Sequence, residues 1–184
     1  MQIFLPQETF LAIKNTHIFI DTCILLDFAN FKKKQGKAEF LNKLTLFTKN
    51  GCVFVTIMPV AVEFFLGSTQ QDLKIKKRYF NQLIKTTLPV KIIKEKTIED
   101  LILEYGRYAR GNVSYVDLCL GAAIRQFPGS LLLTRNYKDF PLKIFDCRGV
   151  FTVHLNKEVR TYCFYEYRKR DKEKKAKKKG SVPF

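Results

Sequence analysis

Four carboxylates stand out because each lies within, or at the edge of, a run of apolar residues: Asp21, Glu63, Asp117 and Asp139. Such a run normally becomes core, where a lone carboxylate is costly to bury unless a partner neutralises it. Hard divalent cations prefer carboxylate oxygens, so several such groups in one small domain predict a cation-binding cluster. A cation held in this way positions a water molecule, promotes its deprotonation, and stabilises charge that develops on a phosphate.

The remainder of the chain is strongly basic. Its 184 residues carry a formal net charge of +16. The block Arg168–Lys179 holds nine Lys or Arg against two Asp or Glu, a net +7 that leaves +9 elsewhere. A basic body with a basic tail favours an anionic partner, either nucleic acid or an anionic membrane surface. An acidic cluster inside a basic protein predicts a metal-dependent nuclease whose Lys and Arg side chains hold the strand through its phosphates.

Other classes fit the composition less well. No apolar run approaches the ~18 residues that span a bilayer, and Gln7 and Glu8 stand where a signal peptide needs apolar residues. We therefore expect a cytoplasmic protein with no membrane partner. The five cysteines include no C-x-x-C pair, which favours reduced core residues over a zinc site. His17 and His154 lie far apart and in no motif, so they are poor candidates for an acid–base pair.

The length favours one folded domain, which we place at residues 1–160, followed by a lysine-rich tail at 161–184. Apolar β-type runs alternate with segments of helical period. We expect strands at 17–21, 52–56, 90–93 and 130–134, with 143–146 or 151–155 as further candidates. We expect helices at 37–49, 59–65, 70–85, 97–110 and 114–125. This alternation predicts an α/β fold with a mainly parallel sheet covered on both faces.

In such sheets ligands bind at the carboxyl ends of the strands. Asp21 follows the first expected strand directly, and Asp139 lies just after the strand at 130–134, so both should sit at that edge. Glu63 and Asp117 fall one to two turns into helices and could point back toward it.

Each carboxylate also has an ordinary explanation. Asp21 could cap the helix that follows it, and Glu63 could lie on a solvated helix face. Asp27 could be a second acidic contributor beside Asp21, but we expect it on a solvated helix face. The spacing of Ser114 and Asp117 is that of a capping box.

Turn chemistry alone could likewise account for Asn136 and Asp139. The order of the four acids favours a site: one after the first strand, one in the helix after the second, one in a late apolar helix, and one after the next strand.

This order resembles that of the PIN-domain nucleases. The resemblance covers roughly residues 15–155 and rests on three stretches: the strand ending in Asp21-Thr22-Cys23; Val60-Ala61-Val62-Glu63; and Asp117 in its apolar helix, followed by Leu132-Leu133-Thr134-Arg135-Asn136-Tyr137-Lys138-Asp139-Phe140. The last stretch is especially similar to that of the single-domain toxin ribonucleases of type II bacterial toxin–antitoxin pairs (VapC-like).

The resemblance implies a three-layer α/β/α sandwich, an acidic pocket that holds Mg²⁺ or Mn²⁺, and cleavage of RNA phosphodiester bonds. Matched by position, the catalytic and metal-binding residues are Asp21, Glu63, Asp117 and Asp139. Their polar companions toward the substrate are Thr22, Thr134 and Asn136. Asn136 and Asp139 are both candidates for the position nearer the metal. Relatives of the toxin type also suggest an antitoxin protein and a second copy of the chain as partners.

Two other classes remain as alternatives. A non-catalytic RNA-binding module on the same fold would keep the basic surface without needing the intact acidic set. A phosphotransfer enzyme of the dehalogenase type needs a second aspartate two residues after the first, where this chain has Cys23. No Walker or dinucleotide-binding glycine pattern is present in the sequence, which argues against nucleotide binding.

Overall fold

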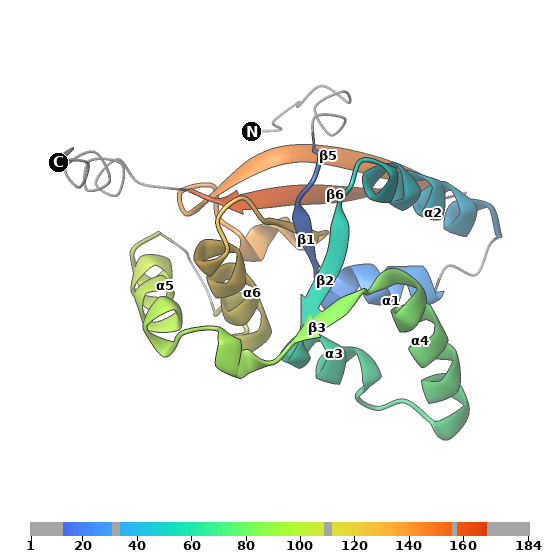
Figure 1. Cartoon of the computed structure of the whole chain (residues 1–184), viewed down its shortest axis with the longest axis horizontal. Coiled ribbons are helices and arrows are strands. Elements are labelled where there is room, and N and C mark those ends of the chain that lie inside the picture. The colour runs from blue at the N-terminus through green and yellow to red at the C-terminus, as the bar shows by residue number, and fades with distance from the viewer. Residues whose placement is uncertain (1–12, 31–33, 109–111, 156–157, 169–184) are drawn as a thin grey trace, which may run out of the picture.

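A computed structural model describes residues 13–30, 34–108, 112–155 and 158–168, and Figure 1 gives their arrangement. The six strands of one mixed sheet, in chain order, are β1 (His17–Ile20), β2 (Val53–Ile57), β3 (Thr86–Leu88), β4 (Leu131–Thr134), β5 (Phe145–Leu155) and β6 (Glu158–Tyr167). The α-helices of the described residues are α1 (Thr22–Asn30), α2 (Lys34–Lys49), α3 (Met58–Phe65), α4 (Gln70–Leu83), α5 (Glu95–Tyr108) and α6 (Tyr115–Gln126). Two short 3₁₀ helices are η2 (Val90–Ile92) and η3 (Tyr137–Asp139).

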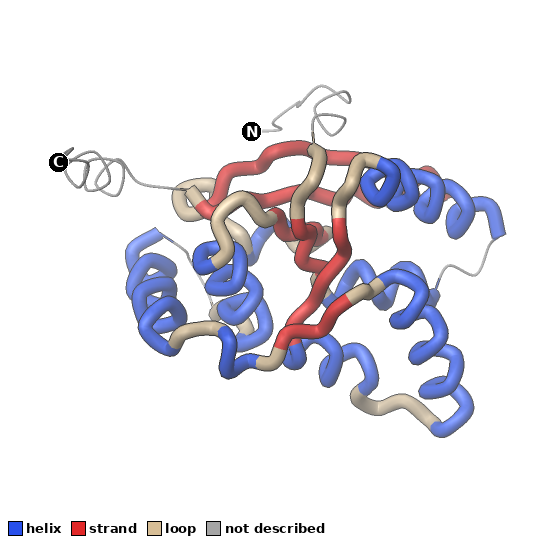
Figure 2. Tube along the Cα trace, viewed as in Figure 1, coloured by secondary structure: helices blue, strands red, loops and turns tan. Residues whose placement is uncertain are grey.

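The sheet order is β3-β2-β1-β4-β6-β5. The first four strands in this order run parallel, and β6 is antiparallel to both β4 and β5. The α/β class and the mainly parallel centre are therefore confirmed. Figure 2 shows the parallel strands running through the middle of the molecule among the helices, with the long strands β5 and β6 along its upper side.

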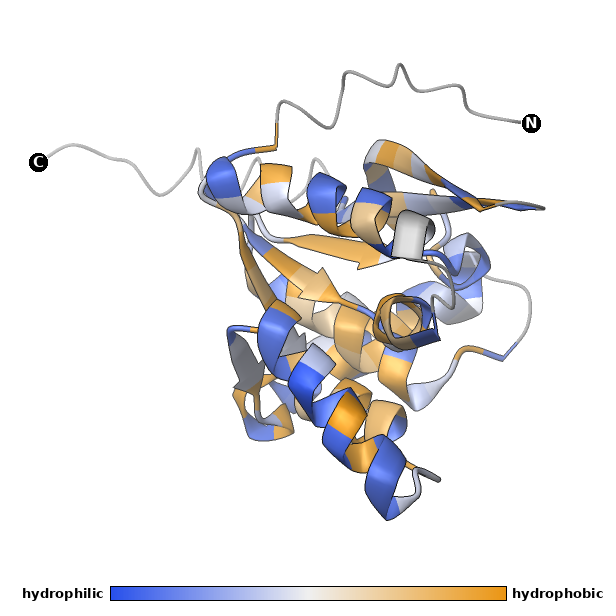
Figure 3. Cartoon of the chain, turned by 90° about the vertical axis from the view of Figure 1, so that its right-hand side faces the viewer, coloured by the Kyte–Doolittle hydropathy of each residue, from blue (hydrophilic) through white to orange (hydrophobic). Residues whose placement is uncertain are grey.

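Helices lie on both faces of the sheet, as two residues of β6 that point to opposite faces show. Phe164 packs against Phe47 of α2 on one face, with ring centroids 4.9 Å apart. On the opposite face Tyr167 packs edge-on against Phe145, which lies beside Gly121 of α6. A Cβ at Gly121 would lie 3.1 Å from the Phe145 ring, so a glycine allows the helix to approach this closely. Hydrophobic residues concentrate on the strands and on the inward sides of the helices (Figure 3).

Most predicted elements occur within a few residues of their expected bounds, but the strand predicted at 90–93 is wrong. Those residues form η2, and the neighbouring strand is β3, at Thr86–Leu88. Pro89 explains the difference, because it offers no N–H to a sheet ladder and fixes a turn-forming φ of −69°. Its carbonyl accepts a hydrogen bond from the N–H of Ile92 at 3.1 Å, which closes the 3₁₀ turn.

The C-terminal part of the sheet also differs from the expectation. The two candidate segments at 143–146 and 151–155 belong to one long strand, β5, with a bulge between Cys147 and Gly149 that interrupts the period of two. Strand β6 was not predicted, and it runs across residue 160, where we placed the end of the domain. The expected helix end at 109–110 and the tail after residue 168 lie outside the described residues. Within the described part, no helix is both long enough and apolar enough to cross a membrane.

Candidate active site

The topology of the sheet places Asp21 beside Thr134. The chain runs outward from β1 through β2 to β3 and then returns to the other side of β1 as β4, so the strand order reverses between β1 and β4. In doubly wound sheets this switch point is where ligands bind. At the carboxyl ends of these two strands the N–H of Asp21 donates to the carbonyl of Leu133 at 3.2 Å. The Thr134 hydroxyl donates to Oδ2 of Asp21 at 2.6 Å.

Asp21 is only 5% exposed. Its Oδ2 also accepts from the Cys23 thiol at 3.0 Å, and that sulfur accepts the N–H of Arg135 at 3.3 Å. Burial raises the pKa of Asp21, the hydrogen bonds from Thr134 and Cys23 oppose that rise, and the charge of Glu63 adds to it. Burial also raises the pKa of Cys23, so this residue is a neutral thiol donor. Asp21 therefore lies among hydrogen-bond donors that carry no positive charge.

Glu63 comes from α3, which follows β2 and has Pro59 in its first turn. The residue as a whole is exposed, yet its carboxylate is held: the Thr22 hydroxyl donates to Oε2 at 2.5 Å. Thr22 is the neighbour of Asp21 and is itself 4% exposed. One short hydrogen bond thus ties the acid after the second strand to the acid after the first.

Asp117 lies at the start of α6, where Ser114 is the N-cap. The Ser114 hydroxyl accepts from the Asp117 N–H at 3.1 Å and donates to its Oδ2 at 2.5 Å. The cap suggested by their spacing is confirmed, and it holds a carboxylate that is 7% exposed. Burial raises the pKa of Asp117 to about 6, against the Ser114 hydrogen bond, and the charges of Asp21, Asp139 and Glu63 contribute to the rise.

Asp139 lies in η3, just after β4. The Asn136 side-chain amide donates to Oδ2 of Asp139, and the backbone N–H of Asn136 donates to the Thr134 hydroxyl at 2.9 Å. Tyr105 of α5 donates its hydroxyl to the carbonyl of Asp139 at 2.5 Å. Burial raises the pKa of Tyr105, and the charges of Asp117 and Asp139 raise it further. Tyr105 therefore ties α5 to η3, the turn that carries Asp139.

The predicted residues are thus brought together in two ways. Hydrogen bonds join Asp21 to Thr134, Thr22 to Glu63, and Asn136 to Asp139. Asp117 belongs to the group through charge, since the other three carboxylates all raise its pKa. None of the ion pairs between described residues involves any of the four acids.

The donor set fits a hard divalent cation in kind, because all four acids offer carboxylate oxygens. Each hydrogen bond from a neighbouring side chain engages a single oxygen of its carboxylate. As arranged, however, no three His, Cys, Asp or Glu side chains of the described residues form a group that could hold a metal ion. Each of the four carboxylates instead accepts a hydrogen bond from a donor of its own.

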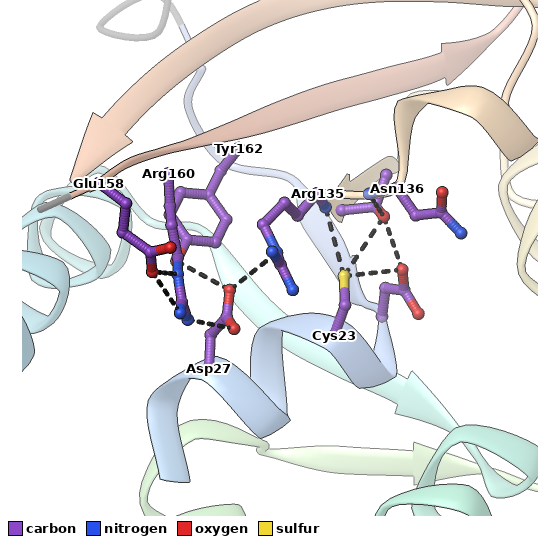
Figure 4. A network of polar contacts seen from close by, with 9 residues as sticks. Cys23, Asp27, Arg135, Asn136, Glu158, Arg160 and Tyr162 are labelled. Carbon is purple, nitrogen blue, oxygen red and sulfur yellow. Dashed lines mark hydrogen bonds and ion pairs between the residues drawn. The ribbon is translucent and has the colours of Figure 1, made fainter. Parts of the chain in front are cut away.

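The expectation that Asp27 lies on a solvated helix face is wrong. Asp27 is 4% exposed and forms ion pairs with Arg135 at 3.0 Å and Arg160 at 2.6 Å (Figure 4). Tyr162 donates its hydroxyl to the same carboxylate at 3.0 Å. Two of these partners belong to β6, so the error follows directly from the strand that was not predicted.

Cys23 and Tyr105 were also not predicted as neighbours of the acids. Cys23 carried a weak signal, because it stands two residues after Asp21. Tyr105 carried none, since a tyrosine on an amphipathic helix is ordinarily a core residue. Comparisons of the chain with protein-family models, curated proteins and solved structures gave no significant match.

Proposed function

We propose that this chain is a metal-dependent endoribonuclease with a PIN-like α/β/α architecture, which hydrolyses RNA phosphodiester bonds with Mg²⁺ or Mn²⁺. One observation carries the proposal. The buried acids of the described residues are Asp21, Asp27, Glu104 and Asp117. Asp27 and Glu104 form ion pairs with arginines, whereas Asp21 and Asp117, both at the candidate site, form none among the described residues.

Burying an uncompensated carboxylate costs several kcal/mol, and in soluble proteins such groups concentrate at functional sites. A divalent cation would remove that cost at Asp21 and Asp117 together, with Glu63 and Asp139 as further oxygen ligands. When bound, the ion supplies activation of a water and neutralisation of charge on the phosphate. This chemistry needs no histidine, which agrees with the absence of histidines from the site motifs.

The residues of the chain then have separate tasks around that ion. Thr134 and Cys23 orient Asp21 through hydrogen bonds of 2.6 and 3.0 Å. Thr22 orients Glu63, and Ser114 orients Asp117, each with a hydroxyl that donates at 2.5 Å.

Asp139 is held by the side-chain amide of Asn136, while the hydroxyl of Tyr105 fixes its carbonyl at 2.5 Å. The carboxylates are therefore held at fixed places at the edge of the sheet. Such preorganisation is what catalysis by electrostatic stabilisation requires.

RNA as the substrate is supported by basic and aromatic side chains on the surface. Helix α4 presents the exposed side chains of Lys74, Lys77 and Arg78, which suit the phosphate backbone of a nucleic acid. Among the described aromatic residues only three tyrosines are exposed, and two of them, Tyr115 and Tyr137, stand two residues before Asp117 and Asp139. Exposed aromatic rings can stack on unpaired bases, so a single-stranded region of RNA suits these tyrosines.

The alternative is a non-catalytic RNA-binding module on the same fold. The lack of a ready-made metal group among the described residues favours it. It would use the basic surface and the exposed tyrosines without a cation. An antitoxin protein, a homodimer and a cytoplasmic location belong to the main proposal, but they rest on the resemblance and the composition alone.

Cleavage of RNA with and without metal separates the two functions. Purified protein should cut single-stranded or loop-containing RNA in Mn²⁺ or Mg²⁺ and lose that activity in EDTA. Asp146→Asn is a suitable control for variants of the site, because Asp146 is a partly exposed acid on the edge strand β5, paired with Arg168 at 2.5 Å. RNA binding without cleavage in either metal would support the alternative, and cleavage undiminished by EDTA would refute the metal mechanism.

A further inference from the structure

Beside the four acids lies a second polar network, centred on Asp27 of α1. The Asp27 carboxylate accepts Arg160 Nη1 on Oδ1 at 2.6 Å. Its Oδ2 accepts Arg135 Nε at 3.0 Å and the Tyr162 hydroxyl at 3.0 Å. Figure 4 shows Arg135 between this network and Cys23. One buried carboxylate thus holds two guanidinium groups.

The two arginines differ in their surroundings. Arg160 is 24% exposed in its side chain and also binds Glu158 at 2.5 Å. The Arg135 side chain is 45% exposed, and its contact with Asp27 is made through Nε, at the inner end of the guanidinium. Because the Glu158 side chain is 53% exposed, water screens its charge, and Arg160 alone can compensate the buried Asp27. Arg135 therefore adds a positive charge that the burial of Asp27 does not require.

The backbone of Arg135 is part of the acidic site. Its N–H donates to the Cys23 sulfur at 3.3 Å, and that thiol donates to Asp21 at 3.0 Å. Arg135 directly follows Thr134, whose hydroxyl binds Asp21 at 2.6 Å. The Arg135 side chain therefore starts at the acidic site. Its ion pair with Asp27 keeps the guanidinium at the edge of the carboxylates, on the side of β6.

We propose that Arg135 binds a phosphate of the RNA strand next to the acidic site, and that Asp27 is the positioning residue that holds its guanidinium there. This assignment rests on the proposed function. Four carboxylates repel a polyanion, so a strand that reaches them needs a fixed positive group at their edge. Arginine is suited to this role, because its planar fork can hold a phosphate bidentately. The ion pair with Asp27 restricts the side chain in advance and so reduces the entropy lost on binding.

The test measures RNA binding in EDTA, where cleavage does not interfere, with a labelled single-stranded RNA over a range of salt concentrations. The proteins are the wild type, Arg135→Met, Arg135→Lys and the control Arg148→Met. Arg148 is a matched control: its side chain is 57% exposed and pairs with Glu166 at 3.3 Å on the β5–β6 ribbon. Melting temperatures of all four proteins are measured in the same buffer.

Arg135→Met should raise the Kd about tenfold, as expected for one charge-assisted contact, and should reduce the log–log salt slope by about 0.7. Its melting temperature should stay close to that of the wild type, and Arg148→Met should leave binding and slope unchanged. Arg135→Lys keeps the charge, so it should keep most of the slope. In Mn²⁺ it should cleave with a lower kcat, because an ammonium cannot replace the planar fork.

Wild-type binding by Arg135→Met at every salt concentration would overturn the assignment and leave the proposed function standing. A wild type that neither binds nor cuts RNA would overturn the proposed function, and the assignment with it. Should Arg135→Met prove unfolded, Arg135→Lys decides: a lower kcat at an unchanged melting temperature supports the role of the fork, and an unchanged kcat refutes it.

Discussion

Two buried aspartates with opposite surroundings lie close together in the chain: Asp21, directly before α1, and Asp27, within it. Asp21 is 5% exposed and Asp27 is 4% exposed. Asp27 has two arginines and a tyrosine hydroxyl around it, whereas Asp21 has a threonine, a thiol and the charge of Glu63 nearby. The two aspartates are thus equally buried. Asp27 has positive partners, whereas Asp21 has neutral donors and a further acid nearby.

The difference separates two uses of a buried carboxylate. At Asp27 the protein supplies its own counter-charge, and the result joins α1 to β6 and to the loop after β4. At Asp21 the counter-charge is missing from the described residues, so the free energy of the folded state is raised locally. Folded proteins tolerate such a local cost mainly where function requires it. The contrast predicts that matched substitutions at the two aspartates will have opposite consequences.

The largest expected effect is on activity at Asp21. Asp21→Asn removes one charge and one strong oxygen ligand from the proposed cation site, so RNA cleavage in Mn²⁺ should fall by about 10³-fold, roughly 4 kcal/mol. The metal-free melting temperature should stay the same or rise, because a repelling carboxylate is gone. Single-turnover cleavage and thermal melting check this, with Asp146→Asn as the control. Retained cleavage would make Asp21 a helix cap only.

Asp27→Asn should behave in the opposite way. It removes the carboxylate that two guanidinium groups share, although Arg135 is 45% exposed and Arg160 keeps Glu158. The loss of charge-assisted hydrogen bonds should therefore cost about 2 kcal/mol. The free energy of unfolding, measured in urea, should fall by about that amount. A variant as stable as the wild type would show that solvent already compensates both arginines, and the contrast between the two aspartates would lose its meaning.

A third prediction concerns pH and Asp117 in the metal-free protein. The folded-state pKa is about 6, against an ordinary value of 3.8, so the folded protein binds more protons than the unfolded chain between these values. Stability from this residue is full below about pH 4 and is lost as the pH rises through about 6. The loss amounts to roughly 2 to 3 kcal/mol. In EDTA, Asp117→Asn should flatten that part of the curve; an unchanged curve would show that Asp117 does not have the raised pKa that its burial and the neighbouring carboxylates produce.

The sequence predicted the parts of the site that depend on local pattern. Asp21 and Thr134 end neighbouring strands, and the spacing of Ser114 and Asp117 marks a helix start, so a few adjacent residues were sufficient to locate them. Asp27 required knowledge of β6, whose Arg160 and Tyr162 come more than 130 residues later. That strand was missed because it begins with the polar residues Glu158, Arg160 and Thr161 and then continues in an unbroken buried run, Tyr162–Tyr165, without a regular period of two. Non-local pairing, rather than local propensity, separates what could be predicted from what could not.

The smallest expected effect is a shift in melting temperature caused by Mn²⁺, and it distinguishes Asp21 from Asp27 most directly. A cation that binds the folded protein stabilises it by mass action, by about 1.4 kcal/mol at ten times its Kd. Mn²⁺ should therefore raise the melting temperature of the wild type. The rise should shrink in Asp21→Asn, which has lost a ligand, and persist in Asp27→Asn, although that variant starts from a lower melting temperature. Sodium chloride at the same ionic strength controls for screening of the carboxylates by salt. An equal shift in both variants would mean that Mn²⁺ acts elsewhere on the protein, and Asp21 would then be an unpaired acid without a cation to explain it.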